Sequence, residues 1–126
     1  MSAIVRATSP EVPEPQPGTW SNCLVIDGIA YFAGATARGD DEYTQAKAIF
    51  AKIKHLIEAA RGGMADIVKV TIFVTDIKNR EQVWKARQEF FTGNFPASTL
   101  VQVAALATPG LKVEIEAVAH IGASRR

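Results

Sequence analysis

The sequence predicts one α+β domain in which two helices cover one face of a mixed β-sheet. The chain has 126 residues, of which 48% are hydrophobic and 21% are charged, as expected for a single folded domain spanning residues 1–126. Two segments have the apolar spacing of amphipathic helices, and the segments around them show the alternation or the short apolar runs of strands. The predicted order is β-β-α-β-α-β-β. Strands that alternate with helices form a mixed sheet, so we expect both helices on the same face.

The N-terminal part of the chain predicts an arm followed by a hairpin. Residues 1–6 are expected to form a short strand, and the proline-rich residues 9–18 an extended arm on the surface. Two apolar runs between residues 23 and 33 flank Asp27-Gly28, and Asp-Gly in that position indicates a tight hairpin turn. Gly34 is expected to end the second strand of the hairpin.

A long amphipathic helix is predicted next. Asp40 is suited to cap its N-terminus, and Glu42 falls in the first turn, where the helix dipole favours a carboxylate. Apolar residues then recur at helical spacing over about five turns, which indicates one buried stripe. They are Ala46, Ile49, Phe50, Ile53, Leu56, Ile57 and Ala60. Gly62-Gly63 is expected to end the helix, because glycine is common just past a helix C-terminus.

The remaining elements are a strand, a second helix and two further strands. In the first of these strands the side chains expected to be buried are Val68, Val70, Ile72 and Val74. Asn79 and Gln82 are expected to form a capping box at the start of the second helix, which Gly93 closes. The apolar face of that helix is predicted to be Val83, Ala86, Phe90 and Phe91. The last two strands are predicted over residues 100–106 and 112–121.

The last predicted strand indicates that the second face of the sheet is partly polar. Because side chains alternate along a strand, one set of residues faces away from the helices. This set is Glu114, Glu116, Val118 and His120, with Phe73, Gln102 and Leu106 expected beside it. A half-polar sheet face on so small a chain meets either solvent or another subunit, and we expect a subunit interface.

Glu114 and Glu116 are the candidate catalytic pair that the residues themselves indicate. Two positions apart on one strand, their carboxylates are expected about 6–7 Å apart on the same face. Carboxylates at that distance can act as an acid/base pair. The alternative is that both are solvated or paired with Lys69 or Lys112.

Several other functions are not expected from the composition. The net charge of +1 gives no electrostatic basis for binding nucleic acid. The two histidines and the single Cys23 lack metal-ligand spacing, and no phosphate-binding loop is present, so we expect neither metal nor cofactor. No apolar run approaches the roughly 20 residues of a membrane helix, and the N-terminus has no signal-peptide pattern. We therefore expect a cytoplasmic protein without a membrane partner.

Several strings resemble the YjgF/RidA family, whose members are also described as L-PSP endoribonucleases. These strings are Asp66–Asp76, Phe90-Phe91, Asn94–Ala97, Val101 with Val103–Leu106, and Val113–Ala119. Ala33-Gly34 fits the family's Ser-Gly-Gln segment, with Ala35 in place of the glutamine. The resemblance spans residues 18 to 119. It implies a chorismate-mutase-like fold and a homotrimer with small-molecule pockets at its subunit interfaces.

The resemblance also implies a set of pocket residues. The family motif Pro-Ala-Arg-Ser uses its arginine to bind a substrate carboxylate, whereas here Ser98 stands in its place. Glu116 matches the family's candidate for positioning or activating water. The positions that match the substrate pocket are Trp20, Gly34, Trp84, Arg87, Ser98, Thr99 and Leu100. Arg38 or Arg87 is a possible substitute cation.

The function that the resemblance implies is hydrolytic deamination of reactive enamines and imines, with a substrate range altered by the missing arginine. The alternative is a non-catalytic trimer of the same fold that binds or senses a small metabolite. Glu116 separates the two hypotheses, because a hydrolase needs its carboxylate and a binding protein tolerates glutamine there. A third hypothesis, a ribonuclease or translation inhibitor, depends on older family descriptions and does not fit the near-neutral charge.

Overall fold

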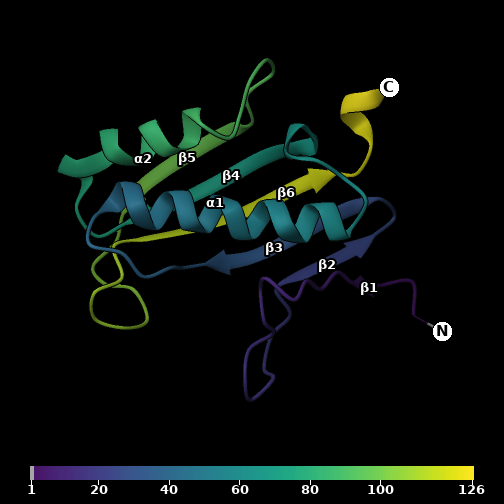
Figure 1. The fold of residues 1–126 in the computed structure, drawn as a ribbon, viewed down its shortest axis with the longest axis horizontal. Coiled ribbons are helices and arrows are strands. Elements are labelled where there is room, and N and C mark those ends of the chain that lie inside the picture. The colour runs from purple at the N-terminus through teal and green to yellow at the C-terminus, as the bar shows by residue number, and fades with distance from the viewer. Residues whose placement is uncertain (1) are drawn as a thin grey trace.

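The computed structural model describes residues 2–126 and shows two helices packed on one face of a six-stranded sheet (Figure 1). This arrangement confirms the predicted α+β class. The strands are β1 (Val5–Arg6), β2 (Cys23–Ile26), β3 (Ile29–Ala35), β4 (Ile67–Val74), β5 (Ala97–Gln102) and β6 (Val113–His120). The helices are α1 (Glu42–Ala59) and α2 (Arg80–Gln88), with short 3-10 turns η1 (Met64–Asp66), η2 (Ile77–Asn79) and η3 (Ala123–Arg125).

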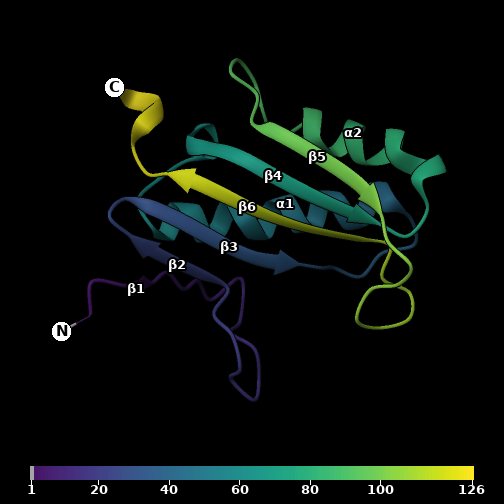
Figure 2. The ribbon, with the colours of Figure 1, turned by 180° about the vertical axis from the view of Figure 1, so that it is seen from behind.

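The strands lie in the order β1-β2-β3-β6-β4-β5. All neighbours are antiparallel except β4 and β5, which run parallel with α2 in their connection. Seen from behind, the sheet has β6 in its middle and no helix in front of it (Figure 2). We call this side the open face and the other the helix side.

The predicted hairpin is confirmed, and its second strand is longer than expected. Asp27 and Gly28 both have positive φ, of 51° and 77°, as a tight Asp-Gly turn requires. The prediction that Gly34 ends the strand is wrong, because β3 continues through Gly34 to Ala35. The pairing of β3 with β6 shifts between Phe32 and Ala35, which places Gly34 at the irregular point.

Helix α1 has the predicted buried stripe, but its N-cap lies one residue after the predicted cap. The side chain of Asp41, not Asp40, accepts a hydrogen bond from the backbone N–H of Thr44 at 2.8 Å. Apart from the half-buried Ala60, the residues of the stripe are buried against the sheet. The ring of Phe50 lies 5.5 Å from those of Phe90 and Phe91, which joins α1 to the end of α2.

Two predicted details of β4 and α2 are wrong. Val68 is exposed because the β4–β6 pairing shifts between Ile67 and Lys69, so Ile67 takes the buried position instead. Asn79 makes no capping hydrogen bond with its side chain. Its amide donates to Glu42 at 2.7 Å, while Gln82 accepts from the backbone N–H of Tyr43, so both side chains tie α2 to α1.

Strand β5 begins at Ala97 and ends at Gln102, which is earlier at both ends than predicted. Because Val101 pairs with the open-face residue Phe73, Gln102 points to the helix side, where it accepts from the backbone of Ile77 at 3.0 Å. The prediction that Gln102 lies on the open face is therefore wrong. Leu106 lies beyond the end of the strand.

Two buried polar side chains hold the loops at opposite ends of the sheet. Gln45 donates to the carbonyls of Gly39 and Gly110, both at 2.9 Å, and accepts from the backbone N–H of Lys112 at 2.8 Å. Asp66 accepts four hydrogen bonds, which come from the backbone of Gly63, Gly122 and Ser124 and from the Ser124 hydroxyl. Burial opposes the ionisation of Asp66, but these hydrogen bonds outweigh it and lower its pKa.

Among residues 2–126, no helix is both long and apolar enough to span a membrane.

Candidate functional site

The open face of the sheet carries the two predicted carboxylates. Glu114 and Glu116 alternate along β6 with buried residues, as predicted. Across the neighbouring strand, Glu114 pairs with Phe73 and Glu116 with Thr71. Both carboxylates therefore lie on the side of the sheet that no helix covers (Figure 2).

Glu114 lies against the backbone of β3 at Gly34. A Cβ atom built on Gly34 would lie 2.3 Å from the Oε2 atom of Glu114, closer than any real contact. Only glycine at position 34 therefore lets the carboxylate approach the strand so closely. Burial, and to a lesser degree the charge of Glu116, raises the pKa of Glu114. The sequence pattern could not distinguish the two glutamates, whereas the structure shows Glu114 as the more shielded one.

Glu116 belongs to a polar row across the sheet. Thr71 of β4 pairs with Glu116 on one side and with Thr99 of β5 on the other. The Thr99 hydroxyl accepts a hydrogen bond from the ammonium group of Lys69 at 2.8 Å. Within the described chain, neither glutamate forms an ion pair with Lys69 or Lys112, so the predicted alternative of a simple salt bridge is not observed. The row places hydroxyl, carboxylate and ammonium groups side by side on one surface.

Other predicted pocket residues lie on the helix side of β5. Ser98 and Leu100 alternate with Thr99, and their partners on β4 are the buried Val70 and Ile72. Arg87, in the last turn of α2, donates from Nη1 to the Ser98 hydroxyl at 2.9 Å. Burial lowers the pKa of this guanidinium.

A cavity of about 300 Å³ opens beside this hydrogen bond, lined by Arg87, Gln88, Phe95, Pro96 and Ser98. We call it the edge cavity, because β5 is the edge strand of the sheet.

The two tryptophans lie apart from both groups. Trp20, which is 58% exposed, is in the loop after the proline-rich arm and lines a separate cavity with Arg6 and Glu14. Trp84 is 38% exposed on α2, and the guanidinium of Arg80 lies 5.7 Å from the centre of its ring. Within one chain, the predicted pocket residues are thus divided between the open face, the edge cavity and two outlying positions.

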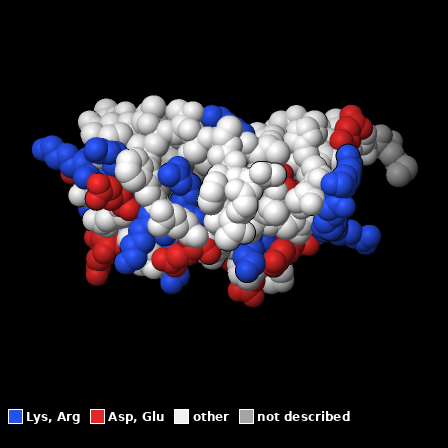
Figure 3. Space-filling view, turned by 90° about the horizontal axis from the view of Figure 1, so that it is seen from above, with Lys and Arg blue, Asp and Glu red and all other residues white. Residues whose placement is uncertain are grey.

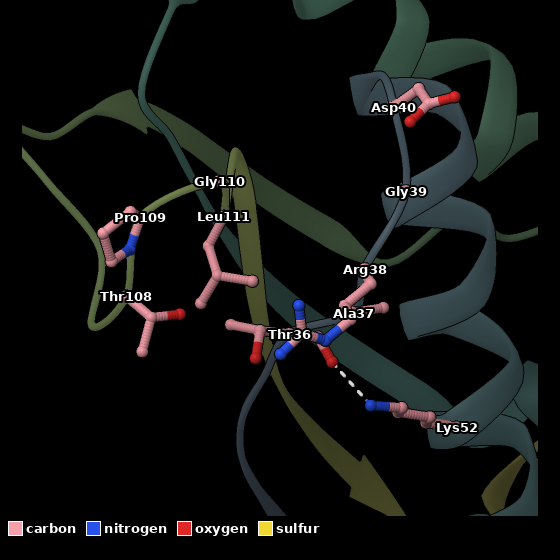
Figure 4. A pocket seen from close by; sticks show the side chains of 10 residues that line it. All are labelled: Thr36, Ala37, Arg38, Gly39, Asp40, Lys52, Thr108, Pro109, Gly110 and Leu111. Atoms are coloured by element: carbon pink, nitrogen blue, oxygen red, sulfur yellow. Dashed lines mark hydrogen bonds between the residues drawn. The ribbon is translucent and has the colours of Figure 1, made fainter.

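A larger cavity, of about 640 Å³, lies between the β3–α1 loop and the β5–β6 loop (Figure 4). Its lining includes Arg38, one of the two possible substitute cations, together with Lys52. The ammonium of Lys52 donates to the carbonyl of Thr36 at 2.6 Å, which fixes one wall, and the side chain of Asp40 points away from the other labelled residues (Figure 4). None of the residues matched to the substrate pocket lines this loop cavity.

The side chains best known for nucleophilic or metal chemistry are poorly placed for it. Cys23 is fully buried, and burial together with the charge of Glu14 raises the pKa of its thiol to about 11. His55 is exposed on α1, and His120 lies at the end of β6 opposite Ile29. Across residues 2–126, no group of three or more histidine, cysteine, aspartate or glutamate side chains is arranged to hold a metal ion.

The open side of the molecule also has little charge. Viewed from above, Lys, Arg, Asp and Glu gather along one long side, whereas the opposite side is nearly free of them (Figure 3). Tyr31 and Val101, which share the open face, are 48% and 40% exposed. Exposed apolar side chains therefore share the open face with the two carboxylates.

Comparison with known proteins places this fold and these motifs in one family. A family model described as endoribonuclease L-PSP matches residues 13–121. A protein of unknown function from Pseudomonas aeruginosa is 36% identical, with a TM-score of 0.90 over 96% of this chain and 94% of that one. A member of the YjgF/YER057c/UK114 family from Mycobacterium tuberculosis is 34% identical, with a TM-score of 0.78 over 81% and 86% of the two chains. RidA from the Antarctic bacterium Psychrobacter sp. is 27% identical, with a TM-score of 0.86 over 93% and 99%. The chain therefore belongs to the endoribonuclease L-PSP family, which includes the YjgF and RidA proteins.

Proposed function

We propose that the protein is a cytoplasmic deaminase that hydrolyses enamines and imines to a carbonyl compound and ammonia. The observation that carries the proposal is the contact between Glu114 and the backbone of Gly34, with Glu116 on the same open face. Two carboxyl groups in different surroundings can divide the roles of acid and base between them. The similarity to RidA supports the same reaction class.

The two glutamates would take different steps of the reaction. Glu114, whose pKa is raised, keeps a proton more readily and would donate it to the enamine carbon, which converts the enamine into an iminium ion. Glu116 would hold the water molecule that attacks the iminium carbon and would accept its proton. Glu116 would then give this proton to the nitrogen of the tetrahedral adduct, so that the C–N bond breaks and ammonia leaves. As the C=O bond forms, the hydroxyl group would lose its proton to Glu114, which restores both side chains. Backbone groups near Gly34 and the hydroxyl groups of Ser98 and Thr99 would bind the substrate.

A second copy of the chain would complete the site. Glu114 and Gly34 lie on the open face, whereas Ser98 and Arg87 lie on the helix side of the edge strand, so one chain does not bring them together. In a closed homotrimer, the edge of each copy would cover the open face of the next and place both groups in one interfacial pocket. The exposed Tyr31 and Val101 would be buried there.

Ammonia release from imines tests the proposal. An amino-acid oxidase would generate imines in place, and the signal is the acceleration over their spontaneous hydrolysis. We expect Glu116→Gln and Glu114→Gln each to lose roughly 10²-fold or more of this acceleration. Glu58→Gln, which removes an exposed carboxylate from α1, serves as the matched control and should keep full activity.

Two results would contradict the proposal. Absence of acceleration for every imine would instead favour the non-catalytic binding protein, and full activity in both glutamine variants would contradict the roles given to Glu114 and Glu116. Sedimentation at several protein concentrations tests the trimer separately, and a monomer at micromolar concentration would contradict the interfacial pocket.

A further inference from the structure

We propose that the loop cavity, between residues 36–40 and 108–111, binds a small phosphate monoester. Arg38 and Lys52 would hold the phosphate group, and the rest of the cavity would hold the polar group that carries it. The occupant would have the size of a sugar phosphate. This inference goes beyond the proposed function, because Gly34 and the two glutamates of the open face are not among the described residues that line the cavity.

The first argument is that two positive side chains share the cavity without a counterion. Arg38, in the β3–α1 loop, and Lys52, on α1, both extend toward Thr36 (Figure 4). The lining contains the acid Asp40, but its side chain points away from the other labelled residues. Among residues 2–126, neither Arg38 nor Lys52 forms an ion pair. Two such cations favour binding of an anion from solution, and a phosphate monoester carries a charge of about −2 at neutral pH.

The second argument is that the lining offers the hydrogen-bond donors that a phosphate group needs. Lys52 spends one of its three N–H donors on the carbonyl of Thr36, at 2.6 Å, and keeps the other two. The guanidinium of Arg38 adds a planar fork of donors, and Thr36 and Thr108 add one hydroxyl group from each loop. A fork, a compact charge and hydroxyl groups together suit a group with three acceptor oxygens.

The third argument is that the walls of the cavity are fixed before a ligand binds. The side chain of Gln45 is fully buried and donates to the carbonyls of Gly39 and Gly110, both at 2.9 Å. It therefore ties both loops to α1. The hydrogen bond from Lys52 to Thr36 ties the first loop to α1 a second time. Loops held in this way lose little conformational freedom on binding, which favours affinity.

The fourth argument is the size and polarity of the cavity. A volume of about 640 Å³ lies in the range of small-molecule sites and leaves room beyond a phosphate group. Apart from Ala37, Pro109 and Leu111, the lining residues are polar or glycine. Within the described chain, the lining has no aromatic side chain on which a nucleobase could stack. A sugar is therefore a better match than a nucleoside for the group that carries the phosphate.

Calorimetric titration with glucose 6-phosphate at constant ionic strength tests the inference. Glucose, which lacks the phosphate, and inorganic phosphate, which lacks the sugar, should each bind at least roughly 10-fold more weakly. We expect Arg38→Gln and Lys52→Gln each to weaken binding of glucose 6-phosphate by roughly 10–100-fold, because each removes hydrogen bonds to a charged group. Arg38→Gln keeps the hydrogen bond between Lys52 and Thr36, so its effect does not depend on a disturbed loop.

Two further variants serve as controls. Lys54→Gln removes an exposed cation from the same helix as Lys52 but outside the cavity, and it should not change the affinity. Glu116→Gln should also bind glucose 6-phosphate normally, which separates this site from the open face. Circular dichroism spectra confirm that the variants are folded. Hydrogen exchange should slow at residues 36–40 and 108–111 when the ligand is bound, which locates the site.

The inference is overturned if the wild-type protein does not bind glucose 6-phosphate, or if Arg38→Gln binds it equally well. Equal weakening by Lys54→Gln would also overturn it, since the effect would then come from overall charge. Binding of inorganic phosphate as tight as that of glucose 6-phosphate would refute the place given to the sugar. Tighter binding of succinate would refute the choice of a phosphate over two carboxylates. Because no outcome depends on turnover, either proposal can fail without the other.

Discussion

Replacing Gly34 with alanine should impair the chemistry of the open face without unfolding the protein. The new Cβ atom would lie 2.3 Å from Oε2 and 2.9 Å from Cδ of Glu114. Ordinary contacts between such atoms are near 3.5 Å, so the carboxyl group must retreat by roughly 1 Å. A displacement of that size in a catalytic group costs about 10²-fold in rate, which equals about 2.7 kcal/mol of activation free energy.

The same substitution should change stability little. Glu114 ends in a flexible side chain that can swing toward solvent, and Gly34 does not have positive φ. Alanine also restricts the unfolded chain, which offsets part of the strain. We therefore expect the free energy of unfolding to change by less than about 1 kcal/mol.

The assay is imine-dependent ammonia release measured beside urea unfolding on the same samples. Gly63→Ala is the matched control, because a Cβ atom there has no heavy atom within 4 Å. Full activity of Gly34→Ala would refute the reasoning, since it would mean that Glu114 need not lie against β3. Equal losses of activity and stability would show a structural role for the glycine instead.

Two further predictions concern the buried polar side chains. Asp66→Asn should lower the free energy of unfolding by about 3 kcal/mol at pH 7, because the amide leaves at least one buried N–H without an acceptor and weakens the other hydrogen bonds. The folded pKa of Asp66 lies below its unfolded value of about 3.9, so this stabilisation is present above about pH 4 and is lost as the pH falls below it. Urea unfolding at fixed protein concentration should show the difference shrinking by about 1.4 kcal/mol per pH unit there, and a difference that stays constant would contradict the assignment. Gln45→Leu removes three hydrogen bonds and should cost about 3 kcal/mol while increasing hydrogen exchange in both loops of the large cavity. Unchanged exchange in those loops would show that Gln45 does not hold them.

Local sequence patterns predicted the elements of the fold better than their boundaries. The helices, the hairpin and the alternation of β6 follow from apolar spacing and turn residues, which act over a few positions. Val68 fits the same alternation but is exposed, because an irregular pairing with β6 reverses the phase at the start of β4. Asp40 and Asp41 are equally suitable as N-cap residues, because both carry a carboxylate. The backbone geometry decides between them, since only the side chain of Asp41 accepts the hydrogen bond from the N–H of Thr44.

The candidate site was harder to predict because its contacts join distant segments. Glu114 and Glu116 have the same residue type and the same face, and the feature that separates them is Gly34 on another strand. The hydrogen bond from Arg87 to Ser98 likewise depends on how α2 packs beside β5. Neither contact can be inferred from the spacing of residues along the chain. The sequence could therefore identify these residues as candidates, but not which of them lie together.

The central place of β6 bears on how the chain folds during its synthesis. β6 is the last strand to be made, yet it lies between β3 and β4 and joins the two halves of the sheet. Until residues 113–120 have been synthesised, β3 and β4 each present an unpaired edge that can associate with other chains. A stop codon before residue 113 would therefore yield two separate sheet fragments prone to aggregation, not a smaller version of the same domain.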